Sequence, residues 1–127
     1  MAVGLSAYLA NKILDHATGG ASFTMPSGVY AKMHTGDPGA SATSAASSQT
    51  TRVACTFSAA SSGAIAMSNT PEFTLSGSET ISHVSFWDAA TSGNFLWSAQ
   101  ATVSKGGASG DIIRLATNSL TLGTLAS

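Results

Sequence analysis

The chain has 127 residues, which favours a single domain, because two domains would each bury too little apolar area. Only 9% of its residues are charged, against roughly 25% in an ordinary soluble domain, and the formal net charge is -1. The basic residues are scattered, which argues against nucleic-acid binding, and no apolar run approaches the ~20 residues of a membrane span. A neutral surface rich in Ser, Thr, Ala and Gly is suited to lying against other protein; the alternative is a monomer with a low-charge surface.

Two further features bear on where the chain is made. The N-terminus lacks a basic region followed by a long apolar stretch, so synthesis in the cytoplasm is inferred. The single cysteine, Cys55, cannot form an internal disulfide, so the fold does not depend on oxidation. We interpret Cys55 as a small buried residue in a strand.

One amphipathic helix is predicted near the N-terminus, over residues 3–18. Apolar residues recur there at i+4, and Gly19 and Gly20 follow as a stop signal. Ser6 is a candidate N-cap. The apolar stripe of the helix consists of Leu5, Tyr8, Leu9 and Ile13. This stripe is a candidate interface with a neighbouring subunit, and the alternative is that it covers the protein's own sheet.

A strand is predicted over residues 29–35, followed by a turn at Asp37, Pro38 and Gly39. Proline presets φ for a turn, aspartate can bond its own backbone, and glycine accepts a positive φ. Residues 40–51 then contain no large apolar side chain. Because such a segment buries too little to fix itself, we expect a mobile arm or one ordered only against a partner.

The rest of the chain, residues 52–127, is predicted to form a β core. Its centre is a hairpin over residues 79–103, which holds both tryptophans and a short polar connection with Gly93 and Asn94. A period of two places Phe95 and Trp97 on one face of the second arm. The large rings expected to form or flank the core are Phe57, Phe86, Trp87, Phe95 and Trp97.

Further short strands are expected on both sides of this hairpin, over residues 52–58, 65–67, 73–75, 112–116 and 120–125. Pro71 places the strand that follows it at a sheet edge or after a turn. Short strands at close, even spacing behind one helix predict a mainly β fold. We expect residues 1–127 to form one compact β-sandwich or barrel of short antiparallel strands with one N-terminal helix.

No catalytic, metal or cofactor site is predicted. The three histidines are far apart in the sequence, the lone cysteine has no partner spacing, and the carboxylates are isolated. The sequence contains no Gly-x-Ser-x-Gly elbow, phosphate loop or dinucleotide fingerprint. His16 can interact with the helix dipole, His34 can bond Asp37 or a backbone carbonyl, and His83 is expected to be half-buried. We therefore expect a protein that is not an enzyme.

An ordered set of short motifs runs along nearly the whole chain. The two most specific are the His-Thr-Gly-Asp-Pro-Gly run of residues 34–39 and the Trp-Asp-Ala run of residues 87–89. Less specific are the Leu-Asp-His run of residues 14–16, the Ile-Ser-His-Val run of residues 81–84 and the Gly-Asn-Phe-Leu-Trp run of residues 93–97. This order resembles a family of small structural proteins from tailed phages of actinobacteria and related hosts, whose members carry tail fibre, minor tail or minor capsid labels.

The resemblance implies a virion component that is made in the host cytoplasm and is present in many copies. The chain has neither heptads nor a repeat from which a fibre shaft could be built. We therefore favour a capsid decoration or minor capsid protein on the outer surface of the head. Its partners would be the major capsid protein and copies of itself, with no cofactor, nucleic acid or membrane. Binding only to the assembled shell would stabilise that shell by mass action.

Two alternatives remain open at the level of sequence. The first is a tail or baseplate accessory or fibre protein that contacts the host surface. The second is a small hydrolase acting on the cell wall, which would require convergent Ser, His and Asp residues or metal ligands. The Ser/Ala-rich segment after Gly39 departs from the family pattern, in which acidic residues would be commoner, and this places any contact inherited through the segment in doubt.

Overall fold

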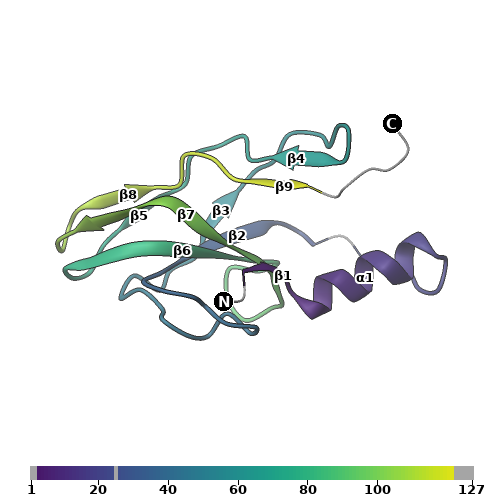
Figure 1. Ribbon diagram of the computed structural model, residues 1–127, viewed down its shortest axis with the longest axis horizontal. Coiled ribbons are helices and arrows are strands. Elements are labelled where there is room, and N and C mark those ends of the chain that lie inside the picture. The colour runs from purple at the N-terminus through teal and green to yellow at the C-terminus, as the bar shows by residue number, and fades with distance from the viewer. Residues whose placement is uncertain (1–2, 25, 122–127) are drawn as a thin grey trace.

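The computed structural model describes residues 3–24 and 26–121 (Figure 1). The elements, in order, are β1 (Gly4–Leu5), α1 (Ala7–Ala17), β2 (Val29–His34), β3 (Val53–Cys55), β4 (Ala64–Ala66), β5 (Glu72–Thr74), β6 (Glu79–Trp87), β7 (Phe95–Gly107), β8 (Ile112–Arg114) and β9 (Ser119–Thr121). The last predicted strand, over residues 120–125, corresponds to β9 as far as residue 121, and its remainder lies outside the described residues.

The strands form one large antiparallel sheet and two small ones. The five-stranded sheet has the order β1-β7-β6-β2-β3, while β4 pairs with β9 and β5 with β8. Figure 1 shows the two small sheets along one side of the large sheet, with α1 projecting at one end. Phe73 and Ile113 from the small sheets share a core cluster with Phe86 of the large sheet. The predicted mainly β, sandwich-like fold with one helix is confirmed, and the strands do not close into a barrel.

The helix begins at Ala7, not at residue 3. Ser6 caps it, because its hydroxyl accepts a hydrogen bond from the backbone N–H of Leu9 at 3.1 Å. Leu5 belongs to β1, where it pairs with Trp97, so it is not part of the helical stripe. The i+4 spacing of Leu5 could not reveal that a two-residue strand precedes the cap.

A β-bulge alters the predicted faces of the hairpin. Phe86 pairs with Trp97, but the next residue of β6, Trp87, pairs with Phe95, so Leu96 is the extra residue. As a result Phe95 contacts Trp87 on one side of the sheet, while Trp97 stacks on Phe86 in the main core at 4.6 Å between ring centroids. The prediction that Phe95 and Trp97 share one face of the second arm is therefore wrong.

A second irregularity lies at the other end of the same hairpin. Ile81 pairs with Lys105, but His83 pairs with Gln100, so residues 101–104 of β7 lie opposite Ser82 alone. These four residues are exposed. The hairpin thus has a one-residue bulge near its loop and a larger irregularity toward its open end.

The segment of residues 40–51 differs from the predicted arm, because it finds its contacts within the domain. Ala42 and Ser47 are buried, and the backbone N–H of Thr35 donates to the carbonyl of Ala45 at 2.8 Å. The carboxylate of Glu79 on β6 accepts hydrogen bonds from the hydroxyl of Ser47 and from Ser48. Polar contacts with β6 therefore replace the large apolar side chains that the segment lacks.

Candidate functional site

The two most specific sequence motifs meet at the loop end of the β6–β7 hairpin. In the first motif, the side chain of Asp37 accepts a hydrogen bond from the backbone N–H of Gly39 at 2.9 Å, and Gly39 has a φ of 78°. Pro38 is buried, and its carbonyl accepts from the backbone N–H of Ser44 at 3.0 Å. The turn thereby directs the following residues back over the hairpin, where Ala42 packs with Trp87 and Phe95.

A buried chain of hydrogen bonds joins this turn to the second motif. The indole N–H of Trp87 donates to Ser85 Oγ at 2.8 Å, and Ser85 Oγ lies 2.8 Å from His34 Nε2. His34 Nδ1 lies 2.9 Å from the carbonyl oxygen of Ser44. Because a carbonyl can only accept, Nδ1 carries the proton and Nε2 accepts from the Ser85 hydroxyl. Every member of the chain therefore has a partner.

The surroundings favour the neutral form of His34. His34 and Ser85 are both 0% exposed. Removal from water lowers the pKa of His34, and although the carbonyl of Ser44 works in the opposite direction, the nearby Lys32 and His83 lower the pKa further. A neutral imidazole with its proton on Nδ1 also fits the two hydrogen bonds that His34 makes to Ser44 and Ser85.

The Ser85–His34 pair has the spacing of a nucleophile and its general base, and its environment decides what it can do. A substrate would have to reach Ser85 Oγ, which is fully buried and already accepts from Trp87. A backbone carbonyl, not a carboxylate, orients the imidazole. In this conformation the pair holds the turn against the hairpin and does not contact solvent.

The loop between β6 and β7 is fixed from both sides. The guanidinium of Arg52 lies 3.8 Å from the ring centroid of Trp87 and donates to the carbonyls of Ala89 and Ser92 at 2.9 and 2.6 Å. Asp88 accepts from the backbone and side-chain N–H groups of Asn94 at 2.7 and 2.9 Å. Residues 90–94 are therefore presented to solvent in one defined shape.

The predicted core rings are divided between two clusters. Phe86 and Trp97 lie in the main core, with Phe57 packed edge-on against Trp97 at 5.8 Å between centroids. Trp87 and Phe95 form the smaller cluster beneath the turn. The smaller cluster is the one that supports the candidate site, and a period of two could not separate it from the main core.

The predicted interface stripe mostly covers the protein's own sheet. Leu9 is buried in the main core, and Tyr8 and Ile13 pack against it. Leu5, on β1, is 39% exposed. The large apolar side chain that α1 does expose is Leu14, at 62%, which the stripe did not include. The exposure of Leu14 depends on which face of α1 packs against the sheet, and the spacing of apolar residues alone does not define that face.

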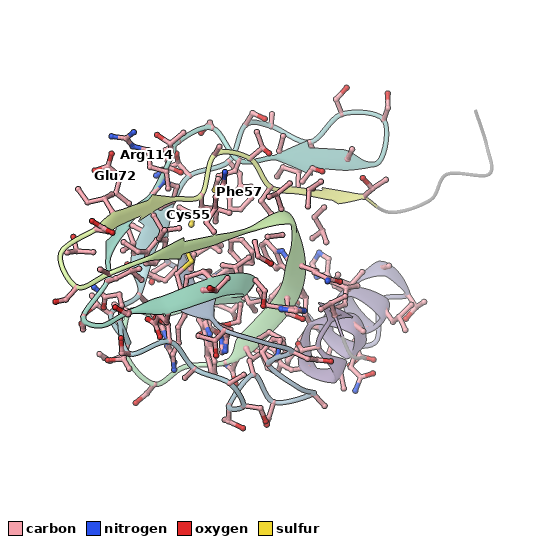
Figure 2. The ribbon with its side chains drawn as sticks, turned by 60° about the vertical axis from the view of Figure 1, so that its left-hand side comes forward. Cys55, Phe57, Glu72 and Arg114 are labelled. Carbon is pink, nitrogen blue, oxygen red and sulfur yellow. The ribbon has the colours of Figure 1, made fainter. Side chains whose placement is uncertain are left out.

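The remaining candidate residues have structural partners. His16 Nδ1 accepts from the backbone N–H of Phe23 at 3.1 Å, and His83 Nδ1 lies 2.8 Å from Ser82 Oγ. Cys55 is buried, and burial raises the pKa of its thiol to about 11. Figure 2 shows Cys55 and Phe57 in the interior, between the strands. Within residues 3–24 and 26–121, no group of three or more His, Cys, Asp or Glu residues is placed to hold a metal.

Membrane crossing by a helix finds no support in the described part of the chain, where α1 is too short and too polar for it.

Comparison with known protein families gives a match for this chain. The family described as Podophage GP4 fiber I protein gp80 matches residues 4–123. The chain belongs to this family. The match includes both motifs of the candidate site and the whole of the described β domain, so the gp80 family assignment applies to the fold as a unit. No curated protein matches the chain.

Membership of the gp80 family confirms the predicted phage structural protein and virion component. The host group stays a prediction, as does the position of the chain on the particle. The family description names a fibre protein, which supports the tail or fibre alternative at least as well as the capsid-decoration interpretation favoured from sequence.

Proposed function

We propose that the chain is a subunit of a virion fibre, and that it acts as a folded contact domain of the fibre and not as its shaft. The observation that carries this proposal is the match of residues 4–123 to a podophage fibre family. Because the match extends over both motifs and the sheet between them, it concerns the whole domain and not one shared hairpin.

The geometry of the loop end supports a contact role. Ala42 of the segment 39–46 packs with Trp87 and Phe95, which flank the loop of residues 88–94, and His34 bonds both Ser44 of that segment and Ser85 of β6. A surface that already has one fixed shape in the free protein loses little conformational entropy when a partner docks. We propose that this surface, the loop platform, contacts a neighbouring virion protein or the host surface.

A second candidate is a capsid decoration protein, and one observation favours it. The domain is compact, only 9% of its residues are charged, and its sequence lacks the repeat of a fibre shaft. Such a domain could bind junctions between major capsid subunits and stabilise the assembled shell by mass action. Neither candidate requires catalysis, a cofactor or nucleic acid, and we propose that the chain is not an enzyme.

The deciding experiment is cryo-electron microscopy of intact particles, in which this domain is fitted into the density and its copies are counted. Density confined to the tail or its fibres supports the fibre proposal. Density repeated over the icosahedral head overturns it and supports decoration. Particles that lack the chain provide the control, because the assigned density must disappear from them.

A surface variant tests the loop platform separately. Thr91→Arg places a bulky charge on the exposed loop, and we expect the folded protein to be lost from particles. Ser109→Arg makes the same kind of change at the exposed turn before β8 and should be incorporated normally. Equal incorporation of both variants would remove the contact role of the loop platform, while the location of the chain would still be decided by microscopy.

A further inference from the structure

A groove of about 380 Å³ lies beside the half of the β6–β7 hairpin that is farther from its loop. One wall is the bulged part of β7, residues 99–103, and the other is the segment from Ile113 to Asn118. The floor is formed by apolar side chains of the large sheet, including Met33, Ile81 and Val84. The two layers of the sandwich are thus not fully closed along β7.

The bulge explains why the groove is open. Residues 101–104 have only Ser82 opposite them on β6, and β1 pairs with β7 only at Trp97 and Ser98. Val103, on the wall of the groove, is 64% exposed. Val103 and the apolar floor together form a continuous apolar surface, and such surfaces mark contact sites more often than single exposed residues do.

The charged residues that line the groove are of one sign. Lys105 and Arg114 are among its lining residues, and no aspartate or glutamate is among the described residues that line it. Arg114 also forms an ion pair with Glu72 outside the groove, and Figure 2 shows these two side chains together at the edge of the domain. Lys105 is therefore the cation best placed to meet an acidic group of a ligand.

The helix α1 carries an exposed surface whose polarity and charge are complementary to those of the groove. Leu14 on α1 is 62% exposed, and the exposed Asp15 follows it directly. In Figure 1, α1 projects away from the sheets, on the far side from the β5–β8 pair. An apolar side chain beside a carboxylate on a projecting helix matches an apolar groove with a cationic rim in both polarity and charge.

We propose that the groove receives α1 of a second copy of this chain, with Leu14 on the apolar floor and Asp15 facing Lys105. This proposal concerns self-association, and it holds for a fibre subunit and a decoration protein alike. Because the helix and the groove are different surfaces, the contact is heterologous, so successive copies form either a closed ring or an open row. The formal net charge of -1 gives little repulsion between copies.

Sedimentation velocity of the full chain over a range of concentrations tests the proposal. We expect the native protein to associate, and Leu14→Asp to weaken the association at least about tenfold, equivalent to about 1.4 kcal/mol. Ile112→Asp is the matched control, because Ile112 is a similarly exposed aliphatic residue that does not line the groove. A monomeric native protein, no effect of Leu14→Asp, or an equal effect of Ile112→Asp would overturn the proposal.

Charge exchange tests the orientation of the contact. Asp15→Lys and Lys105→Asp should each weaken association, and the chain that carries both changes should recover it. Circular dichroism of each variant establishes that the fold is retained. If the double variant associates no better than the single variants, Asp15 and Lys105 do not face each other and the proposed orientation is wrong.

A cross-link gives an independent measurement at the proposed contact. In an equimolar mixture of Leu14→Cys and Val103→Cys copies, oxidation should produce a disulfide-linked dimer. The mixture of Leu14→Cys with Ile112→Cys is the control and should yield much less mixed dimer. Equal yields in the two mixtures would show random collision and would contradict the docking of Leu14 in the groove.

Discussion

The two ends of the β6–β7 hairpin are built from the same pair of strands, yet they have opposite characters. Near the loop, β2 and β1 flank the pair, and residues 83–87 and 95–98 are all buried. At the open end, residues 100–106 of β7 are exposed and the pairing is interrupted opposite Ser82. The half near the loop carries consecutive large apolar residues, Phe95, Leu96 and Trp97, and has strand neighbours on both sides, whereas the open half of β7 has few large side chains and fewer strand partners.

The polar groups at the two ends differ in the same way. In the described part of the chain, no buried side-chain nitrogen or oxygen lacks a hydrogen-bond partner, and the Trp87–Ser85–His34 chain is a main reason at the closed end. A shift of register there would break that chain and turn the large rings to the wrong side. The open end has no comparable constraint, so it is the half that is free to receive a partner.

The largest expected contrast comes from removing side chains at each end. Phe86→Ala deletes a fully buried ring that stacks on Trp97, so the free energy of unfolding should fall by about 3–5 kcal/mol. Val103→Ala, at the exposed bulge, should change it by less than about 0.5 kcal/mol. Urea unfolding at equal protein concentration measures both values. Similar losses would show that the open end is as strongly packed as the closed end.

The next effect concerns the buried hydrogen bonds. Ser85→Ala leaves the Trp87 N–H without an acceptor and His34 Nε2 without a donor, so we expect a loss of about 2–4 kcal/mol. Ser104→Ala is the matched change at the exposed bulge and should be close to neutral. Thermal unfolding followed by tryptophan fluorescence would report both. A neutral Ser85→Ala would mean that the chain of bonds contributes little to stability.

A smaller effect is expected from replacing glycines of positive φ in two turns, the β6–β7 loop and the turn before β8. At Gly93, where φ is 75°, an added Cβ would clash with Asp88 Oδ1, so Gly93→Ala should cost about 1–3 kcal/mol. At Gly110, where φ is 91°, an added Cβ would meet nothing within 4 Å, and only backbone strain of about 1 kcal/mol is expected. Hydrogen exchange of residues 88–94 should increase only in Gly93→Ala. An unchanged exchange rate would argue against the tight loop.

The smallest effect is a dependence of stability on pH. Burial lowers the pKa of His34 in the folded protein below its value of about 6.5 in the unfolded chain. The unfolded chain therefore binds the proton first, so the contribution is complete above about pH 6.5 and is lost as pH falls below that value. The slope cannot exceed about 1.4 kcal/mol per pH unit for one proton.

The His34→Gln variant isolates this slope, because glutamine cannot titrate. The measurement is the urea midpoint at several values between about pH 8 and pH 5, and the readout is the slope and not the absolute stability. Glu79 does not interfere with this measurement. Burial raises the pKa of its carboxyl, but hydrogen bonds from Ser47 and Ser48 outweigh burial and lower it. The contribution of Glu79 to stability is therefore lost only at more acid pH than that of His34. Equal slopes in the native protein and His34→Gln would exclude His34 as the cause.

Local patterns in the sequence were sufficient for the elements that depend on near neighbours. The cap at Ser6, the turn at Asp37 to Gly39 and the existence of the hairpin follow from residues within a few positions of one another. The fold class follows from the number and spacing of the strands. These features require no knowledge of what packs against them.

The features that define the candidate site depend on distant neighbours instead. The bulge at Leu96 sends Phe95 and Trp97 to different clusters, and simple alternation assumes that no bulge exists. Residues 40–51 make their contacts with distant parts of the chain, among them Glu79 and Trp87, so their composition alone predicted mobility. Ser85 had no local signal, because its role depends on the pairing of β2 with β6.

The buried Cys55 has a consequence for a protein that leaves a reducing cell as part of a particle. Burial raises the pKa of its thiol to about 11, so the thiol stays protonated and is poorly reactive toward oxidants in either environment. Cys55 is therefore expected to remain a reduced thiol both inside the cell and in the released particle. For the same reason, a cysteine introduced on the surface would be the one reactive thiol of the chain and could be labelled without first replacing the native residue.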